Sequence, residues 1–225
     1  MLAYERQVFI MKILAINGSP RKNGTTSTLL EHALKGAASQ GFKTEIIHLR
    51  DLDFSGCLGC FSCKLKDGQS YGKCAAKDEL TPILSRIKDD DALVIGSPNY
   101  IGGPSSLMKA FIERLVYPNM VYDDNWSTLF PKTLPIGFIY TMSSSEQWMK
   151  EMGYDQYPTF IVNALKLFFG SADALIVNDT NVFDDYSKYM YERTNPAEKA
   201  RTARERLPED CRKAFDLGVR LTRQE

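Results

Sequence analysis

Short apolar runs alternate with amphipathic stretches along most of this chain, and that alternation restricts its fold more than any other feature. The runs expected to form strands cover residues 12–17, 44–49, 92–97, 134–141 and 174–179. The intervening stretches expected to form helices cover 25–40, the residues after Asp78, those after 104, 159–170, 195–206 and 208–223. Strands that are apolar on both faces and joined by helices are typical of a parallel sheet covered on both sides. We therefore predict a doubly wound α/β domain.

No linker or repeat divides the chain, so residues 1–225 are expected to form one domain. Residues 1–10 are interpreted as an N-terminal extension before Met11, and 195–225 as a C-terminal helical tail. Twenty-eight basic and 28 acidic residues give no net charge, which argues against nucleic acid as a partner. No apolar run approaches the roughly 20 residues that span a membrane. Glu5 and Arg6 argue against a signal peptide, so a cytoplasmic location is expected.

The turn after the first strand reads GSPRKNGTTS, residues 18–27, and leads directly into a helix. A helix that begins at such a turn points free N–H groups and its positive dipole end towards an anion. The turn contains neither a P-loop motif nor the G-x-G-x-x-G dinucleotide motif. The alternative is a simple helix cap without a ligand. The candidate phosphate-binding residues are Ser19, Arg21, Asn23, Thr25, Thr26 and Ser27.

A second motif, SPNYIGG at 97–103, follows the third strand. Together with GSPRKNGTTS, and with a group of cysteines between the two, it resembles the flavodoxin-like NAD(P)H-dependent FMN reductases, particularly the branch that includes the iron–sulfur flavoproteins. The resemblance covers roughly residues 11–180. It implies a five-stranded, three-layered flavodoxin-like sheet of order 2-1-3-4-5 that binds FMN. It also implies a homodimer or homotetramer and NAD(P)H as an electron donor.

In such a sheet the ligand lies beyond the carboxyl ends of the strands, where the strand order reverses. Both motif loops end there. The resemblance implies that the second loop binds the isoalloxazine ring, with glycine N–H groups reaching its N5 and O4 atoms; a tight turn before the next helix is the alternative. The candidate residues are Pro98, Asn99, Tyr100, Ile101 and Gly102, with Thr141 and Ser143 from the end of the fourth strand.

Four of the five cysteines fall between residues 57 and 74. In a reducing compartment this clustering favours a metal, a cluster or redox chemistry over structural disulfides. Cys57, Cys60, Cys63 and Cys74 resemble the ligand motif of the iron–sulfur flavoproteins, which implies a [4Fe–4S] cluster, although the last gap is longer than is usual there. Redox-active thiols and a zinc site remain alternatives. The fifth cysteine, Cys211, is expected in the core, and His32 and His48 are expected to be structural.

Three long connections, 117–133, 143–157 and 179–194, are rich in aromatic residues. They suit a subunit interface or a ligand cover, or else they pack against the core of their own subunit.

These patterns favour an FMN-dependent oxidoreductase that passes electrons from NAD(P)H or a reduced carrier to a quinone, flavin, metal or protein. No catalytic side chain is predicted, because the flavin itself carries the electrons. One alternative is a non-enzymatic electron carrier of the iron–sulfur flavoprotein type. Another is a module that senses redox state through its flavin or cysteines.

Overall fold

The computed structural model describes residues 10–192 and 195–223, and a parallel sheet lies at its centre. The strands are β1 (Lys12–Asn17), β2 (Lys43–His48), β3 (Ala92–Tyr100), β4 (Gly103–Pro104), β5 (Leu134–Thr141) and β6 (Gly170–Val177). Five of them pair in parallel in the order β2-β1-β3-β5-β6. The two-residue β4 pairs antiparallel with the end of β3. Since β4 lies off the main path, this order matches the predicted 2-1-3-4-5 order and confirms the flavodoxin-like α/β fold.

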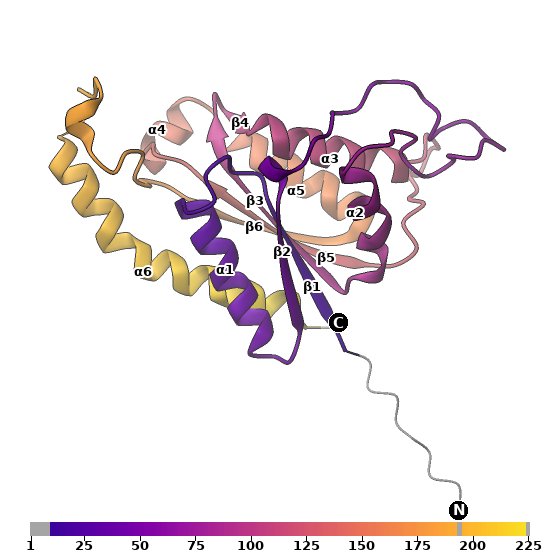
Figure 1. Ribbon diagram of the computed structural model, residues 1–225, viewed down its shortest axis with the longest axis horizontal. Helices are drawn as coiled ribbons and strands as arrows, with labels where there is room; N and C mark the ends of the chain where they lie inside the picture. The colour runs from indigo at the N-terminus through magenta and orange to yellow at the C-terminus, as the bar shows by residue number, and fades with distance from the viewer. Residues whose placement is uncertain (1–9, 193–194, 224–225) are drawn as a thin grey trace, which may run out of the picture.

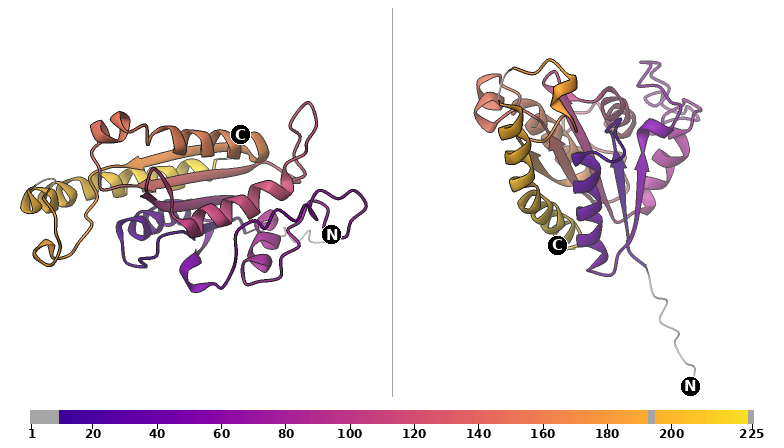
Figure 2. Two further views of the ribbon diagram at one scale, coloured as in Figure 1. Left: turned by 90° about the horizontal axis from the view of Figure 1, so that it is seen from above. Right: turned by 60° about the vertical axis from the view of Figure 1, so that its left-hand side comes forward.

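Helices cover both faces of the sheet and complete three layers (Figures 1 and 2). They are α1 (Thr25–Ala38), α2 (Leu80–Arg86), α3 (Ser106–Asn119), α4 (Glu146–Glu151), α5 (Gln156–Phe169) and α6 (Pro196–Leu221). Helices α1 and α6 lie on one face, and α2, α3 and α5 lie on the other. Three short 3₁₀ turns add to these: η1 (Leu49–Asp51), η2 (Ile87–Asp89) and η3 (Tyr186–Lys188). The predicted 143–157 connection therefore contains a helix, α4.

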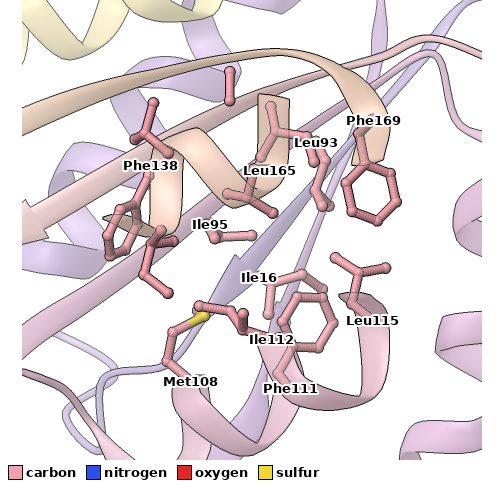
Figure 3. Close-up of a cluster of buried hydrophobic side chains, with 14 of the residues drawn as sticks. Ile16, Leu93, Ile95, Met108, Phe111, Ile112, Leu115, Phe138, Leu165 and Phe169 are labelled. Carbon is pink, nitrogen blue, oxygen red and sulfur yellow. The ribbon is translucent and has the colours of Figure 1, made fainter. Parts of the chain in front are cut away.

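Each face of the sheet has its own hydrophobic core. On the face covered by α3 and α5, Ile16, Ile95 and Phe138 of the strands belong to one buried cluster with Phe111 of α3 (Figure 3). Side chains that are fully buried in this way each contribute about 1.5–3 kcal/mol through removal from water. The two cores hold the strands in place, so the loops at their carboxyl ends start from fixed positions.

The prediction of two C-terminal helices, 195–206 and 208–223, is wrong, because α6 continues through Pro208. A proline inside a helix removes one backbone hydrogen bond, but Pro208 is exposed, so water can solvate the carbonyl that loses its partner. Packing against α1 compensates: a Cβ on Gly36 would lie 2.1 Å from the Phe215 carbonyl oxygen, and one on Gly218 only 1.8 Å from that of Ala33. Both glycines thus let the two helix backbones touch.

Three further predictions concern the N-terminal extension, the buried position of Cys211 and the lack of a membrane span. Most of the expected N-terminal extension, residues 1–9, falls outside the described residues. Cys211 is buried between α6 and α1, as predicted. Among the described residues, no helix is both long and apolar enough to cross a bilayer.

Candidate functional site

The turn between β1 and α1 is fixed by bonds from its neighbours. The N–H of Gly18 donates to the carbonyl of Gly96 at 2.8 Å, and the hydroxyl of Ser105 donates to the carbonyl of Gly18 at 2.6 Å. The N–H of Ser19 donates to Asn17 Oδ1 at 2.8 Å. The turn is therefore held by β3 and by the start of α3, with little freedom to move.

Helix α1 begins at this turn without a side-chain cap. Its N-cap residue is Gly24, whose backbone is extended (φ −91°, ψ 172°), and no acidic residue lies in the first turn. The first N–H groups of a helix have no partner within the helix, and the dipole adds positive potential there. The local geometry is thus that of an anion site with Arg21 and Lys22 beside it.

A cavity of about 850 Å³ opens above this helix end and reaches the carboxyl ends of β3 and β5. Its volume is that of a cofactor site. Most predicted residues line it: Ser19, Arg21, Asn23, Thr25, Thr26, Pro98, Asn99, Tyr100, Thr141 and Ser143. We call this cavity the crevice. A 2.8 Å hydrogen bond between the hydroxyls of Thr26 and Thr141 joins its two walls, α1 and β5.

Three predicted residues do not line the crevice. Ser27 is buried behind it, and its hydroxyl has no hydrogen-bond partner among the described residues. Ile101 is fully exposed at the tip of the β3–β4 turn, with a positive φ of 55°. The N–H of Gly102, expected to face a flavin, instead donates to Asn99 Oδ1 at 2.8 Å.

Residues after β6 complete the crevice, and sequence reasoning did not name them as site residues. They are Thr180, Asn181, Val182, Phe183, Asp184 and Tyr189. The guanidinium of Arg21 donates to the carbonyl of Val182, and Phe183 stacks on Tyr189 with ring centroids 3.9 Å apart. The aromatic content of the 179–194 connection was the available signal, and this part of it lines the crevice.

The cysteine loop, residues 52–79, lies along the second half of α3. The buried Arg114 guanidinium, whose side chain has no exposed surface, pairs with Asp78 at 2.5 Å and donates to the carbonyl of Ser55 at 3.1 Å. The N–H of Cys57 donates to Glu113 at 3.3 Å. These contacts attach both ends of the loop to α3.

Cys57, Cys60, Cys63 and Cys74 line one cavity of about 300 Å³ between this loop and α3. All four are free thiols; Cys57 and Cys60 are exposed and Cys63 is buried. Among the described residues, no three His, Cys, Asp or Glu side chains are grouped closely enough to hold a metal ion. The four predicted ligands therefore share a cavity without forming a coordination geometry.

The surroundings of Cys60 and Cys63 shift the pKa values of these two thiols in opposite directions. Hydrogen bonds from Ser62 lower the pKa of the Cys60 thiol, whereas burial raises the pKa of Cys63. Burial opposes the charge on Arg114, but hydrogen bonds with Asp78 and Cys74 leave the pKa of the guanidinium raised. A permanent cation thus lies beside Cys74.

Residues 11–145, more than half of the chain, match the NADPH-dependent FMN reductase family. The chain belongs to this family. The match includes both motif loops and the cysteine loop, and it ends before α4. The walls of the crevice contributed by residues 180–189 thus lie outside the matched region.

Two curated relatives are iron–sulfur flavoproteins. One from Methanocaldococcus jannaschii is 39% identical over 104 residues, which are 46% of this chain and 51% of that protein. One from Archaeoglobus fulgidus is 41% identical over 104 residues, covering 46% of this chain and 48% of the relative. The aligned part of the chain spans about half the length of these relatives.

Solved structures show the same fold over nearly the whole chain. An NAD(P)H:quinone oxidoreductase from Methanothermobacter marburgensis superposes with a TM-score of 0.70 at 15% identity, covering 95% of this chain and all of that one. An azoreductase from Bacillus anthracis gives 0.65 at 10% identity, covering 94% of this chain and all of that one. At such low sequence identities these comparisons show that the fold is shared, and nothing beyond the fold.

Proposed function

We propose that this protein is an FMN-dependent oxidoreductase that takes electrons from NAD(P)H or a reduced carrier and passes them to a quinone, flavin or protein acceptor. The observation that carries this proposal is the crevice itself. There the uncapped start of α1 and the two motif loops meet at one edge of the sheet. Membership of the FMN reductase family supports the same conclusion.

The residues present fit FMN. The uncapped N–H groups at Gly24–Thr26 and the hydroxyls of Ser19 and Thr25 suit a phosphate monoester. Farther along the crevice, Pro98–Tyr100 and Thr141–Ser143 present a mixed polar and apolar surface of the kind that a flat heteroaromatic ring requires.

In this arrangement the residues of the crevice would bind the FMN, orient its ring and shield it from water. Arg21, held by Val182, would supply a positive charge near the phosphate. Asn99 is fixed by the N–H of Gly102, which leaves its amide group oriented towards the crevice edge beside Met142. Phe183 and Tyr189 would exclude water from one side. When bound, the flavin supplies the hydride and electron chemistry.

Loss of flavin binding tests the phosphate site. The double variant Ser19→Ala/Thr25→Ala is expected to lose FMN during gel filtration, whereas Ser39→Ala at the other end of α1 keeps it. Unchanged flavin content in the double variant would refute the site. Steady-state NAD(P)H oxidation with added quinone then separates the enzyme from an electron carrier or a redox sensor, which turn over little without a partner protein.

We also propose a second cofactor, a [4Fe–4S] cluster held by Cys57, Cys60, Cys63 and Cys74. The observation in favour is that all four thiols line one cavity. The donor set fits the cluster in number and type, but binding requires the four sulfurs to move closer together. Iron and sulfide analysis after anaerobic purification tests this: about four iron atoms per chain support it. Bound zinc, or thiols without metal, would refute it.

The chain is further proposed to form a homodimer or homotetramer in the cytoplasm. The exposed aromatic and apolar side chains of Ile101, Tyr122 and Trp126 support an interface, and five free cysteines suit a reducing compartment. Light scattering that gives the mass of a single 25.4 kDa chain would refute the oligomer.

A further inference from the structure

A second cavity lies beside the crevice, between the loop after β6 and helix α6. Its volume is about 350 Å³, and it shares Thr25, Thr180, Asn181 and Asp184 with the crevice. Thr25 is the first residue of α1. The proposed phosphate site therefore stands between two cavities. FMN would fill only one of them, because its phosphate is the end of the molecule.

An unpartnered carboxylate points to a ligand in this second cavity. Asp210 lines it and is only 7% exposed, yet its side chain has no hydrogen bond or ion pair among the described residues. A buried carboxylate without a partner is unfavourable, and burial raises the pKa of Asp210. The two cations that act electrostatically on its carboxylate, Arg206 and Lys213, form ion pairs elsewhere. Arg206 pairs with Asp179 at 2.7 Å and Lys213 with Glu209 at 3.6 Å.

The remaining lining suits a nucleoside. Ala200, Ala203 and Leu207 of α6 form an apolar wall on which a flat base can lie. Asn178 and Asn181 line the cavity from the loop after β6, with their amides donating to the carbonyls of Ser144 and Phe183. A buried carboxylate is the group that dinucleotide-binding proteins use to accept hydrogen bonds from ribose hydroxyls. Asp210 is placed to do the same.

Arg204 adds a cation at the edge of this cavity. It is exposed, lines the cavity and has no ion pair within the described part of the chain. A guanidinium can stack on a base or bind a phosphate with two hydrogen bonds. Either contact suits a nucleotide that passes from the start of α1 into this cavity.

We propose that this cavity is a nucleoside subsite that binds the adenosine part of a dinucleotide. The proposal rests on the proposed function for the adjoining phosphate site. Two molecules contain this group. FAD would occupy the crevice and the subsite at once, whereas NAD(P)H would place its adenosine there while FMN occupies the crevice.

Isothermal titration of the full chain with ADP, with and without bound FMN, tests the subsite. ADP is expected to bind, and Asp210→Leu should weaken it about tenfold or more, since hydrogen bonds to a charged group are lost. Ala203→Leu, which fills the cavity from the partly exposed wall of α6, should weaken ADP similarly. Asp216→Leu, an exposed carboxylate on the same helix, is the control and should leave ADP affinity unchanged.

Two further titrations identify the source of the adenosine. If it comes from FAD, FAD binds the flavin-free chain more tightly than FMN and blocks ADP. If it comes from the nicotinamide cofactor, NADPH competes with ADP on the FMN-loaded chain. Failure of ADP to bind either form would overturn the subsite, as would unchanged ADP affinity in both Asp210→Leu and Ala203→Leu. A chain that binds ADP but not FMN would instead refute the proposed function.

Discussion

Placing a carboxylate at the start of α1 should separate the stability of the helix from its capacity to bind phosphate. In Gly24→Asp the extended backbone of residue 24 accepts a side chain. The new Cβ would lie 3.3 Å from Cβ of the exposed Arg21, which can shift. An aspartate here caps the first turn and complements the dipole, so the flavin-free protein should gain about 0.3–1 kcal/mol.

The same carboxylate should repel a bound phosphate. Two unit charges about 4 Å apart near a protein surface interact by about 4 kcal/mol, which corresponds to a loss of roughly a thousandfold in affinity. FMN binding should therefore fall by about that factor. Riboflavin, which has the same ring without the phosphate, should bind Gly24→Asp and the wild type equally well.

Equilibrium titration of flavin fluorescence measures both affinities, and urea denaturation measures the stability. Gly24→Asn is the matched control: it caps the helix without adding charge, so its loss of FMN affinity measures competition for the N–H groups alone. The further loss in Gly24→Asp then measures the repulsion between the two charges. If Gly24→Asp binds FMN as tightly as the wild type does, the phosphate does not lie at the start of α1. Equal losses for FMN and riboflavin would point to a distorted crevice instead and would also refute the reasoning.

Four more predictions follow from other parts of the structure. Arg114→Met leaves Asp78 without its partner and should cost about 3–5 kcal/mol in urea denaturation; a loss below 1 kcal/mol would contradict the role of this pair. The pKa of Asp78 is lowered in the folded protein. The stability that this carboxylate contributes is therefore present above its unfolded-state pKa and is lost as the pH falls through the lower folded-state value. Asp78→Asn should flatten the acid limb of the curve of unfolding free energy against pH. In metal-free protein, iodoacetamide should alkylate the exposed Cys60 before the buried Cys63, and peptide mass mapping that finds the reverse order would disprove the assigned environments. Gly102→Ala places a side chain at a φ of 80° and 3.1 Å from Tyr154, which should cost about 1–2 kcal/mol; unchanged thermal stability would mean that this turn relaxes.

The sheet could be predicted from the sequence because its central strands β1, β3 and β5 are apolar on both faces. That the turn after β1 lines the crevice was also predictable, since glycine, hydroxyl and cationic residues stand together where β1 ends. The course of α6 was not, because Pro208 is locally a helix breaker and only packing across Gly36 and Gly218 keeps the helix continuous.

The residues that close the crevice after β6 could not be assigned from the sequence, since their contact with Arg21 joins positions far apart in the chain. The buried Asp210 escaped prediction for a similar reason. Along the sequence it is one acidic residue in a charged helix, and only the fold shows that it faces a cavity. The cysteine spacing pointed to shared chemistry, and the structure adds that the four thiols line one cavity beside Arg114.

The visible absorption spectrum of the FMN-treated, gel-filtered protein during anaerobic addition of NADPH tests the central claim most directly. The account predicts that flavin bands remain with the protein after gel filtration and bleach when NADPH is added. A protein that emerges without flavin would contradict it.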